Sequence, residues 1–289
     1  MKKLLYLLLL AAISISLIGA EGRCQRRSAM TSEQVMDRMT AAMIDSAKTF
    51  HLQGLVDVST NTPLFGSAAG GGALNFSFNL DGYVDQTEKS AKAKSDVSGQ
   101  LETQGVTISG KGKTMLADDY MYLLIEQAPA FFMPNVERNV WTKKPFAQTE
   151  LTPEEMYQLK QLLKNHRLFK VAQDFGVEKS KASTAYHYKL AFDRAEAVKY
   201  MEDWAKVKKM EVTRDMRDEL EPLLDQAEKI DAEIWIDQSS FYISRLKVNM
   251  PIEEDDQQLD FSADLTLDQY NEPVEISIPA DAKEVSPEY

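Results

Sequence analysis

The side chains best suited to catalysis or metal binding are sparse in this chain. There are three histidines, His51, His166 and His187, and one cysteine, Cys24. Zinc sites and Cys/His catalytic pairs need such residues close together, and zinc ligands usually follow short, characteristic spacings. The histidines are far apart in sequence and the cysteine lies near the N-terminus. The sequence therefore predicts no catalytic residue, no metal and no cofactor, and we expect each histidine to face solvent or cap a helix.

Two other motifs resemble ligand sites but lack essential parts. Gly70–Gly72 is not followed by the Lys-Ser/Thr pair of a phosphate loop, and it precedes a strand pattern, so it is interpreted as a hairpin tip. The acidic run Glu253–Asp256 has no glycine or spaced ligands for calcium and is interpreted as a solvated turn. Paired carboxylates of a glycoside hydrolase have no fixed spacing, which leaves an unrecognised hydrolase as one alternative.

Composition bounds the class of protein. The chain has 289 residues, 44% of them hydrophobic, and a formal net charge of −12. Loss of residues 1–20 would remove Lys2 and Lys3 and no acid, leaving 31 basic and 45 acidic residues and a net charge of −14. Such a surface repels phosphate backbones, so nucleic acid is not expected as a partner.

The N-terminus has the pattern of an export signal. Lys2 and Lys3 precede an apolar run over 4–18, and Gly19 and Ala20 supply small residues for cleavage. Residues 1–20 are predicted to be a signal peptide or an N-terminal anchor, and 21–31 a tether. The protein is therefore expected outside the cytoplasm, in the periplasm or at the cell surface, with membrane association through its N-terminus as an alternative to release.

Cys24 raises the further alternative of lipidation. A lipobox has small uncharged residues before its cysteine, whereas Glu21, Gly22 and Arg23 precede Cys24. The sequence leaves open cleavage after Ala20, lipidation of Cys24 and retention of the leader. With one cysteine, no intrachain disulfide can form, so packing must stabilise the fold.

Hydrophobic periodicity predicts helices separated by runs of strand. A helix begins at Thr31, which forms a capping box with Gln34, and Met39 and Met43 share its apolar face. Alternation then predicts strands; they cover 50–58, 74–80, 83–98, 100–109, 111–117 and 119–127, with Asp81-Gly82 as a turn.

The second half begins with an irregular segment over 128–150 that has a short strand near Trp141. Helices are predicted from Thr152-Pro153, from Asp193 with Glu196, and over 213–230. Strands are expected over 186–192, 234–237, 241–250 and 259–267, with an edge strand over 274–278.

This order, with three short segments, resembles a known superfamily. The segments are Ile234–Asp237 before a hairpin, Tyr270–Val274 and Ile278–Ala282. The chain resembles the LolA-like superfamily, in particular the LppX/LprG-type exported lipoproteins, over 32–285. We expect one such domain there, with a helical insertion at 193–230.

The resemblance implies an α+β fold in which a strongly curved antiparallel sheet forms an incomplete β-barrel and helices cover its concave face. It also implies an apolar cavity that holds acyl chains. Inward-facing side chains of the strands, with methionines beside them, would line that cavity. The expected lining residues are Met39, Met43, Leu74, Phe76, Phe78, Leu80, Met133, Leu246, Val248, Met250, Leu259, Phe261, Leu265 and Leu267.

Three functions are compatible with this sequence. The first is a non-enzymatic protein that binds a lipid or another hydrophobic ligand, including a lipid or lipoprotein carrier of the cell envelope. The second is a sensor or adaptor that binds another envelope protein. The third is the hydrolase named above, which has the least support because no site signature accompanies it.

Overall fold

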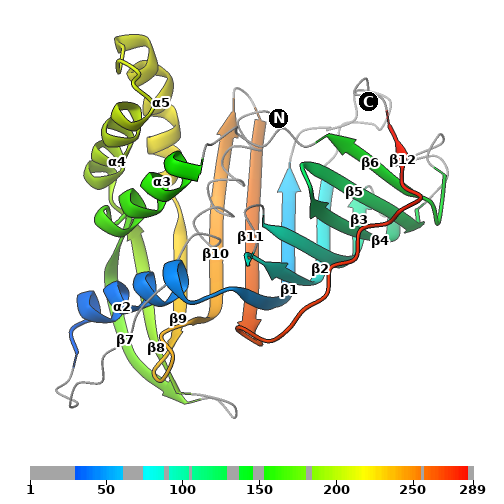
Figure 1. Ribbon diagram of the computed structural model, residues 1–289, viewed down its shortest axis with the longest axis horizontal. Coiled ribbons are helices and arrows are strands. Elements are labelled where there is room, and N and C mark those ends of the chain that lie inside the picture. Colours follow the sequence, from blue (N-terminus) through cyan, green and yellow to red (C-terminus); the bar gives the residue numbers. More distant parts are fainter. Residues whose placement is uncertain are drawn as a thin grey trace. The chain divides into compact units, whose positions relative to one another are not determined.

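The computed structural model describes residues 30–60, 74–87, 91–103, 106–128, 137–145, 153–179, 184–254 and 257–285 (Figure 1). The chain forms two compact units: unit 1 comprises 1–48 and 151–246, and unit 2 comprises 49–150 and 247–289. The expected leader, all but the last two residues of the tether, Cys24, the glycine-rich loop and Met133 lie outside the described residues. The predicted single domain over 32–285, with its insertion at 193–230, stays a prediction.

The described helices belong to unit 1, and two of them begin at the predicted caps. They are α2 (Ser32–Asp45), α3 (Pro153–Asn165), α4 (Arg194–Val207) and α5 (Arg214–Glu228). Thr31 and Gln34 form the capping box of α2, and the Asp193 carboxylate accepts from the backbone N–H of Glu196 at the start of α4. None of the helices in the described ranges is long and apolar enough to cross a membrane.

The described strands form one hydrogen-bonded sheet of 12 strands, ordered β12-β6-β5-β4-β3-β2-β1-β11-β10-β9-β8-β7. Neighbouring strands are antiparallel where their register is known, except that β12 runs parallel to β6. The sheet ends in two different edge strands and does not close on itself, which confirms the predicted α+β fold with an incomplete antiparallel barrel. The strands are β1 (Thr49–Thr60), β2 (Leu74–Asp85), β3 (Lys92–Thr103), β4 (Val106–Ala117), β5 (Tyr120–Gln127), β6 (Trp141–Pro145), β7 (Phe169–Lys179), β8 (Thr184–Phe192), β9 (Asp231–Asp237), β10 (Ile243–Glu254), β11 (Gln257–Asp268) and β12 (Lys283–Glu284).

Within unit 2 the strand direction turns progressively from β11 through β1 and β2 towards β6 (Figure 1). The register places glycines of four adjacent strands on one face of this part of the sheet: Gly54, Gly82, Gly99, Gly110 and Gly112. Glycine in a strand allows bending and close approach of neighbouring backbone, which suits a strongly twisted sheet.

The helices of unit 1 pack against its strands and against one another. α2 contacts β7, α5 contacts β8, and α3 lies against α2 and α4. Tyr188 of β8 is opposite Ile234 of β9, and both side chains are buried. Met39 and Met43 of α2 are also buried, at 5% and 2% exposure, so they contribute to the core of unit 1.

The chain after β11 crosses the strands of unit 2 as an extended segment (red in Figure 1) before β12 pairs with β6. The Thr49 hydroxyl donates to the carbonyl oxygen of Glu272 at 2.7 Å. Farther on, Ile276 and Ile278 pack against a cluster that contains Met115 of β4. Packing therefore fixes this segment without strand pairing over 274–279.

Several predicted elements were wrong, and one strand was missed. The strands predicted over 83–98, 100–109 and 111–117 are divided differently in the structure: 83–85 belong to β2, and the strand residues that follow form β3 and β4. Asp81-Gly82 does not form a turn, because β2 continues through it to Asp85 and pairs with β1 and β3 over its full length. Residues 274–278 alternate like a strand but pair with no strand in the described part of the chain. The strand β7 was not predicted, because two register shifts, between Val171 and Gln173 and between Asp174 and Gly176, interrupt its alternation.

Candidate functional site

The register of unit 2 gathers apolar side chains on one face of β11, β1, β2, β3 and β4. Val58 of β1 is opposite Phe261 of β11 and Phe76 of β2. Two residues away on the same face, Val56 of β1 is opposite Phe78 of β2. The ring centroids of Phe76 and Phe78 are 6.0 Å apart. Residues directly opposite in an antiparallel pair share a face, so these side chains form one continuous apolar surface.

Most of this surface keeps partial solvent access. Large apolar side chains that are only half-buried extend over all five strands: Leu52, Val56, Val58, Phe76, Phe78, Leu80, Val97, Ile108, Leu259, Phe261 and Leu265. Together with the buried Leu74, Leu101, Ala263 and Leu267 they make up what we call the apolar face. A contiguous apolar surface of this kind is characteristic of a binding site.

Eight of the predicted lining residues meet on the apolar face. They are Leu74, Phe76, Phe78 and Leu80 of β2 and Leu259, Phe261, Leu265 and Leu267 of β11. Val248 and Met250 lie on β10, where Met250 is buried, while Leu246 belongs to unit 1 with Met39 and Met43. The lining role of all of these residues stays a prediction.

A pocket of about 670 Å³ lies among the strands of the apolar face and β10, and most of its lining residues belong to the opposite, mainly polar face of the sheet. Its lining includes three carboxylates, Asp57, Glu102 and Asp260, with amides and hydroxyls around them. The other lining residues are Val58, Ser59, Asn75, Phe76, Ser77, Gln100, Asn249, Met250, Pro251, Phe261 and Ser262. The polar groups would leave hydrogen bonds unmade against an acyl chain, so this pocket does not suit a lipid tail.

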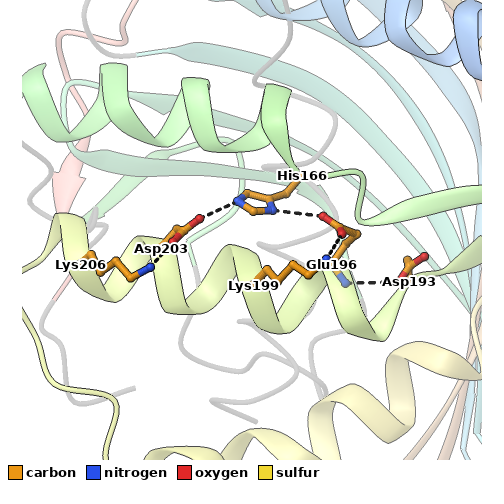
Figure 2. A network of polar contacts seen from close by, with 6 residues as sticks. All are labelled: His166, Asp193, Glu196, Lys199, Asp203 and Lys206. Carbon is orange, nitrogen blue, oxygen red and sulfur yellow. Dashed lines mark hydrogen bonds and ion pairs between the residues drawn. The ribbon is translucent and has the colours of Figure 1, made fainter.

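Each histidine lies between two carboxylates. His166, just after α3, has Nδ1 at 3.2 Å from Glu196 and Nε2 at 3.0 Å from Asp203, both on α4 (Figure 2). Lys199 and Lys206 bind the same two carboxylates from three residues farther along the helix. The pKa values of Glu196 and Asp203 are both lowered from the usual range. The hydrogen bond from the lysine is the largest cause in each case, and the hydrogen bond with His166 is the second largest. This network joins the end of α3 to α4.

His187 occupies the same kind of position in the strands of unit 1. Its Nδ1 lies 2.8 Å from Glu178 of β7 and its Nε2 lies 2.7 Å from Glu233 of β9. The imidazole stacks on Trp235 at 4.0 Å between ring centroids. The Trp235 indole donates to Glu178 at 2.8 Å, and this bond, followed by that of His187, lowers the pKa of Glu178.

His51 of β1 links three adjacent strands of unit 2, β11, β1 and β2. Its Nδ1 lies 2.8 Å from Asp268 of β11 and its Nε2 lies 3.0 Å from Asp81 of β2. Burial, the largest single effect, lowers the pKa of His51, but the hydrogen bonds and charges of the two carboxylates together raise it above its ordinary value. The expectation of solvent-facing or capping histidines was wrong: His51 and His187 are each 7% exposed, and every histidine bridges two acids.

These networks are not arranged as metal sites. The two carboxylates around each histidine contact different ring nitrogens, so they cannot converge with the imidazole on one ion. No group of three or more metal-ligating side chains is found in the described ranges.

The comparisons with known proteins place the chain in a family. Residues 74–286 match a family described as "Family of unknown function (DUF6612)". The chain belongs to DUF6612. No curated protein matches this DUF6612 member.

Two solved structures resemble this DUF6612 chain only distantly. The lipoprotein LppX of Mycobacterium tuberculosis is 14% identical, with a TM-score of 0.34, and the match covers 80% of this chain and 90% of LppX. MucB, in a complex with MucA(peri), is 8% identical, with a TM-score of 0.11, and its match covers 75% and 88%. Neither similarity is high enough to transfer a function.

The acidic partners of the histidines in this DUF6612 chain were missed by sequence reasoning. Asp81 and Asp268 are 30 and 217 residues from His51, and only strand register brings them to the two ring nitrogens. For His166 a signal was available, because Glu196 and Asp203 are seven residues apart and therefore share one face of a helix.

Proposed function

We propose that unit 2 binds a lipid or another hydrophobic ligand through the apolar face. The observation that carries this proposal is the continuity of half-buried apolar side chains across five hydrogen-bonded strands, centred on Val58 with Phe76 and Phe261. Polar residues occupy the reverse of the same strands, so the two faces of the sheet differ in chemistry. An acyl chain needs an extended apolar surface and few directional contacts.

Binding of this kind needs no covalent step. Each Å² of apolar surface removed from water contributes about 25 cal/mol, and both the ligand and the half-buried side chains would lose exposed area. The aromatic rings of Phe76 and Phe78 offer flat contacts to such a chain. The proposed function is therefore that of a non-enzymatic binding protein.

The place of action that fits this ligand is outside the cytoplasm, at or near a membrane. Its support is the N-terminal pattern of Lys2 and Lys3 before the apolar run over 4–18. A lipid or lipoprotein carrier of the envelope is the specific form of the proposal. Anchoring through Cys24 or through the leader is part of it, and a partner protein in the envelope would act as donor or acceptor.

The experiment uses two matched variants on opposite faces of adjacent strands. Leu80→Gln introduces an amide on the apolar face, whereas Leu55→Gln makes the same change on the polar face, where Leu55 is 39% exposed. The protein is purified without detergent and studied by native mass spectrometry, then titrated with a fluorescent long-chain fatty acid. Circular dichroism checks that each variant is folded.

We expect lipid adducts and saturable fatty-acid binding for the wild type and for Leu55→Gln, and at least about tenfold weaker binding for Leu80→Gln, because an amide is desolvated without a partner. Binding that is absent from the wild type, or equally affected by both substitutions, would contradict the proposed function.

A further inference from the structure

His51 is held by acids on both neighbouring strands. The distances from its ring nitrogens to Asp268 and Asp81 are 2.8 and 3.0 Å, and its side chain is 8% exposed while those acids are 47% and 63% exposed. Carboxylates only accept hydrogen bonds, so both contacts are satisfied together when both ring nitrogens carry a proton. The geometry thus corresponds to an imidazolium that joins β2 and β11 to β1.

The other charged and titratable groups around His51 do not join β2 and β11 to β1 as His51 does. Tyr83 of β2 packs on the imidazole, with 4.7 Å between the two ring centroids. The ammonium group of Lys94 of β3 lies over the Tyr83 ring, 5.5 Å from its centroid. Lys94 also donates to the carbonyl oxygen of Glu275 in the C-terminal segment. Asp96 of β3 is opposite Asp81 but pairs with Lys113 of β4 at 2.6 Å.

The three strands joined by His51, β11, β1 and β2, all belong to the apolar face. Next to His51 along β1, Leu52 points to the opposite face, where it is paired with Leu267 of β11. On the other side of β1, Asp81 precedes Gly82, which is opposite Leu52. Because side chains alternate between faces, the histidine contacts lie directly behind one end of the apolar face.

We infer that proton uptake by His51 regulates ligand binding at the apolar face. In the imidazolium form, the contacts with Asp81 and Asp268 hold β2, β1 and β11 in the arrangement that presents Leu52, Leu80 and Leu267 together. The neutral ring keeps one N–H and leaves one carboxylate facing a lone pair, which releases one of the two strands from the side-chain contact. This inference rests on the proposed function.

The surroundings of His51 are consistent with such coupling. Burial lowers the pKa of the ring, but the two acids more than offset this effect and favour the imidazolium form. Thermodynamic linkage requires the effect to be reciprocal: if protonation strengthens ligand binding, bound ligand must strengthen protonation by the same factor.

The test measures fatty-acid affinity between pH 6 and pH 8 for the wild type and two matched variants. His51→Gln removes the titrating ring, and His187→Gln does the same at a histidine that also lies between two carboxylates but belongs to unit 1. The wild type and His187→Gln are expected to bind about three- to tenfold more weakly at the higher pH. His51→Gln is expected to lose this dependence.

A second readout does not require the His51→Gln variant to fold. The chain has only three histidines, so their Cε1–H resonances can be resolved by NMR and assigned with the His187→Gln and His166→Gln variants. Saturation with the fatty acid is expected to shift the His51 titration midpoint upward by about half a unit to one unit, the shift that corresponds to the same three- to tenfold change.

The outcomes separate the two proposals. If no variant and no pH gives fatty-acid binding, the proposed function fails. If binding is present, but the wild type and His51→Gln share one pH dependence and the His51 midpoint is unmoved by ligand, only the regulation by His51 is overturned.

Discussion

Gly54 of β1 lies so close to Asp264 of β11 that a Cβ atom added to it would overlap the Asp264 carbonyl oxygen. The contact is with backbone, which cannot rotate away as a side chain can. Gly54 therefore marks a point where the two strands need a residue without a side chain to keep their register.

Gly54→Ala is expected to lower the free energy of unfolding by about 1–3 kcal/mol, because the added methyl group forces a backbone shift. Gly110→Ala is the control, since the nearest atom to its added Cβ, the Gln127 carbonyl oxygen, is 3.5 Å away. There the replacement of glycine within a strand is expected to be neutral or slightly stabilising. Urea denaturation measures both; equal losses would show that Gly54 has no special role.

His166 is expected to stabilise the junction of α3 and α4. His166→Ala removes the group that Glu196 and Asp203 share, but both carboxylates keep their lysine partners, so we expect a loss of only about 0.5–1.5 kcal/mol for the hydrogen bonds of the ring. Hydrogen exchange should accelerate in both helices. Lys206→Ala is the control, because its side chain is 75% exposed and an exposed ion pair contributes little to stability. A variant that matches wild-type exchange in α4 would contradict this role for His166.

The stability of the fold is expected to depend on pH through His51. Its pKa is raised in the folded state, so the folded chain binds the proton more tightly than the unfolded chain does. The stabilisation is complete below the ordinary histidine pKa of about 6.5 and is lost as pH rises through the higher folded value. Urea denaturation series at successive pH values should show a steeper loss of stability above about pH 6.5 for the wild type than for His51→Gln. Parallel curves for the two proteins would argue against a contribution of His51 to the pH dependence of stability.

Trp235→Phe isolates one hydrogen bond in the network around His187. The substitution keeps an aromatic ring beside His187 but removes the indole donor to Glu178. The expected cost is about 0.5–1.5 kcal/mol, towards the lower end because Glu178 is 54% exposed. The pKa of Glu178 should rise, since the indole bond is the main cause of its lowering. Trp204→Phe, whose ring lies under Lys208, is the control; equal costs would show that the hydrogen bond is unimportant.

Local patterns determined the elements that depend on neighbouring residues. The helix starts at Thr31 and Asp193 follow from capping side chains that act within one turn. The alternation over Leu74–Leu80 and Leu259–Leu267 already specified two faces for β2 and β11, since the side-chain period of a strand is two. The same patterns misled where pairing was decisive. Residues 274–278 alternate but find no partner strand, and β7 pairs although its bulges break the alternation.

What only the tertiary structure decided is which strands become neighbours and which side chains meet across them. The sequence specified apolar stripes, but the register of β1 with β11 and β2 joined them around Val58. It contained three isolated histidines, but packing brought two acids to each of them, over separations of up to 217 residues for His51. Such contacts depend on long-range backbone pairing, and the free energy of that pairing comes from the whole sheet rather than from any local segment.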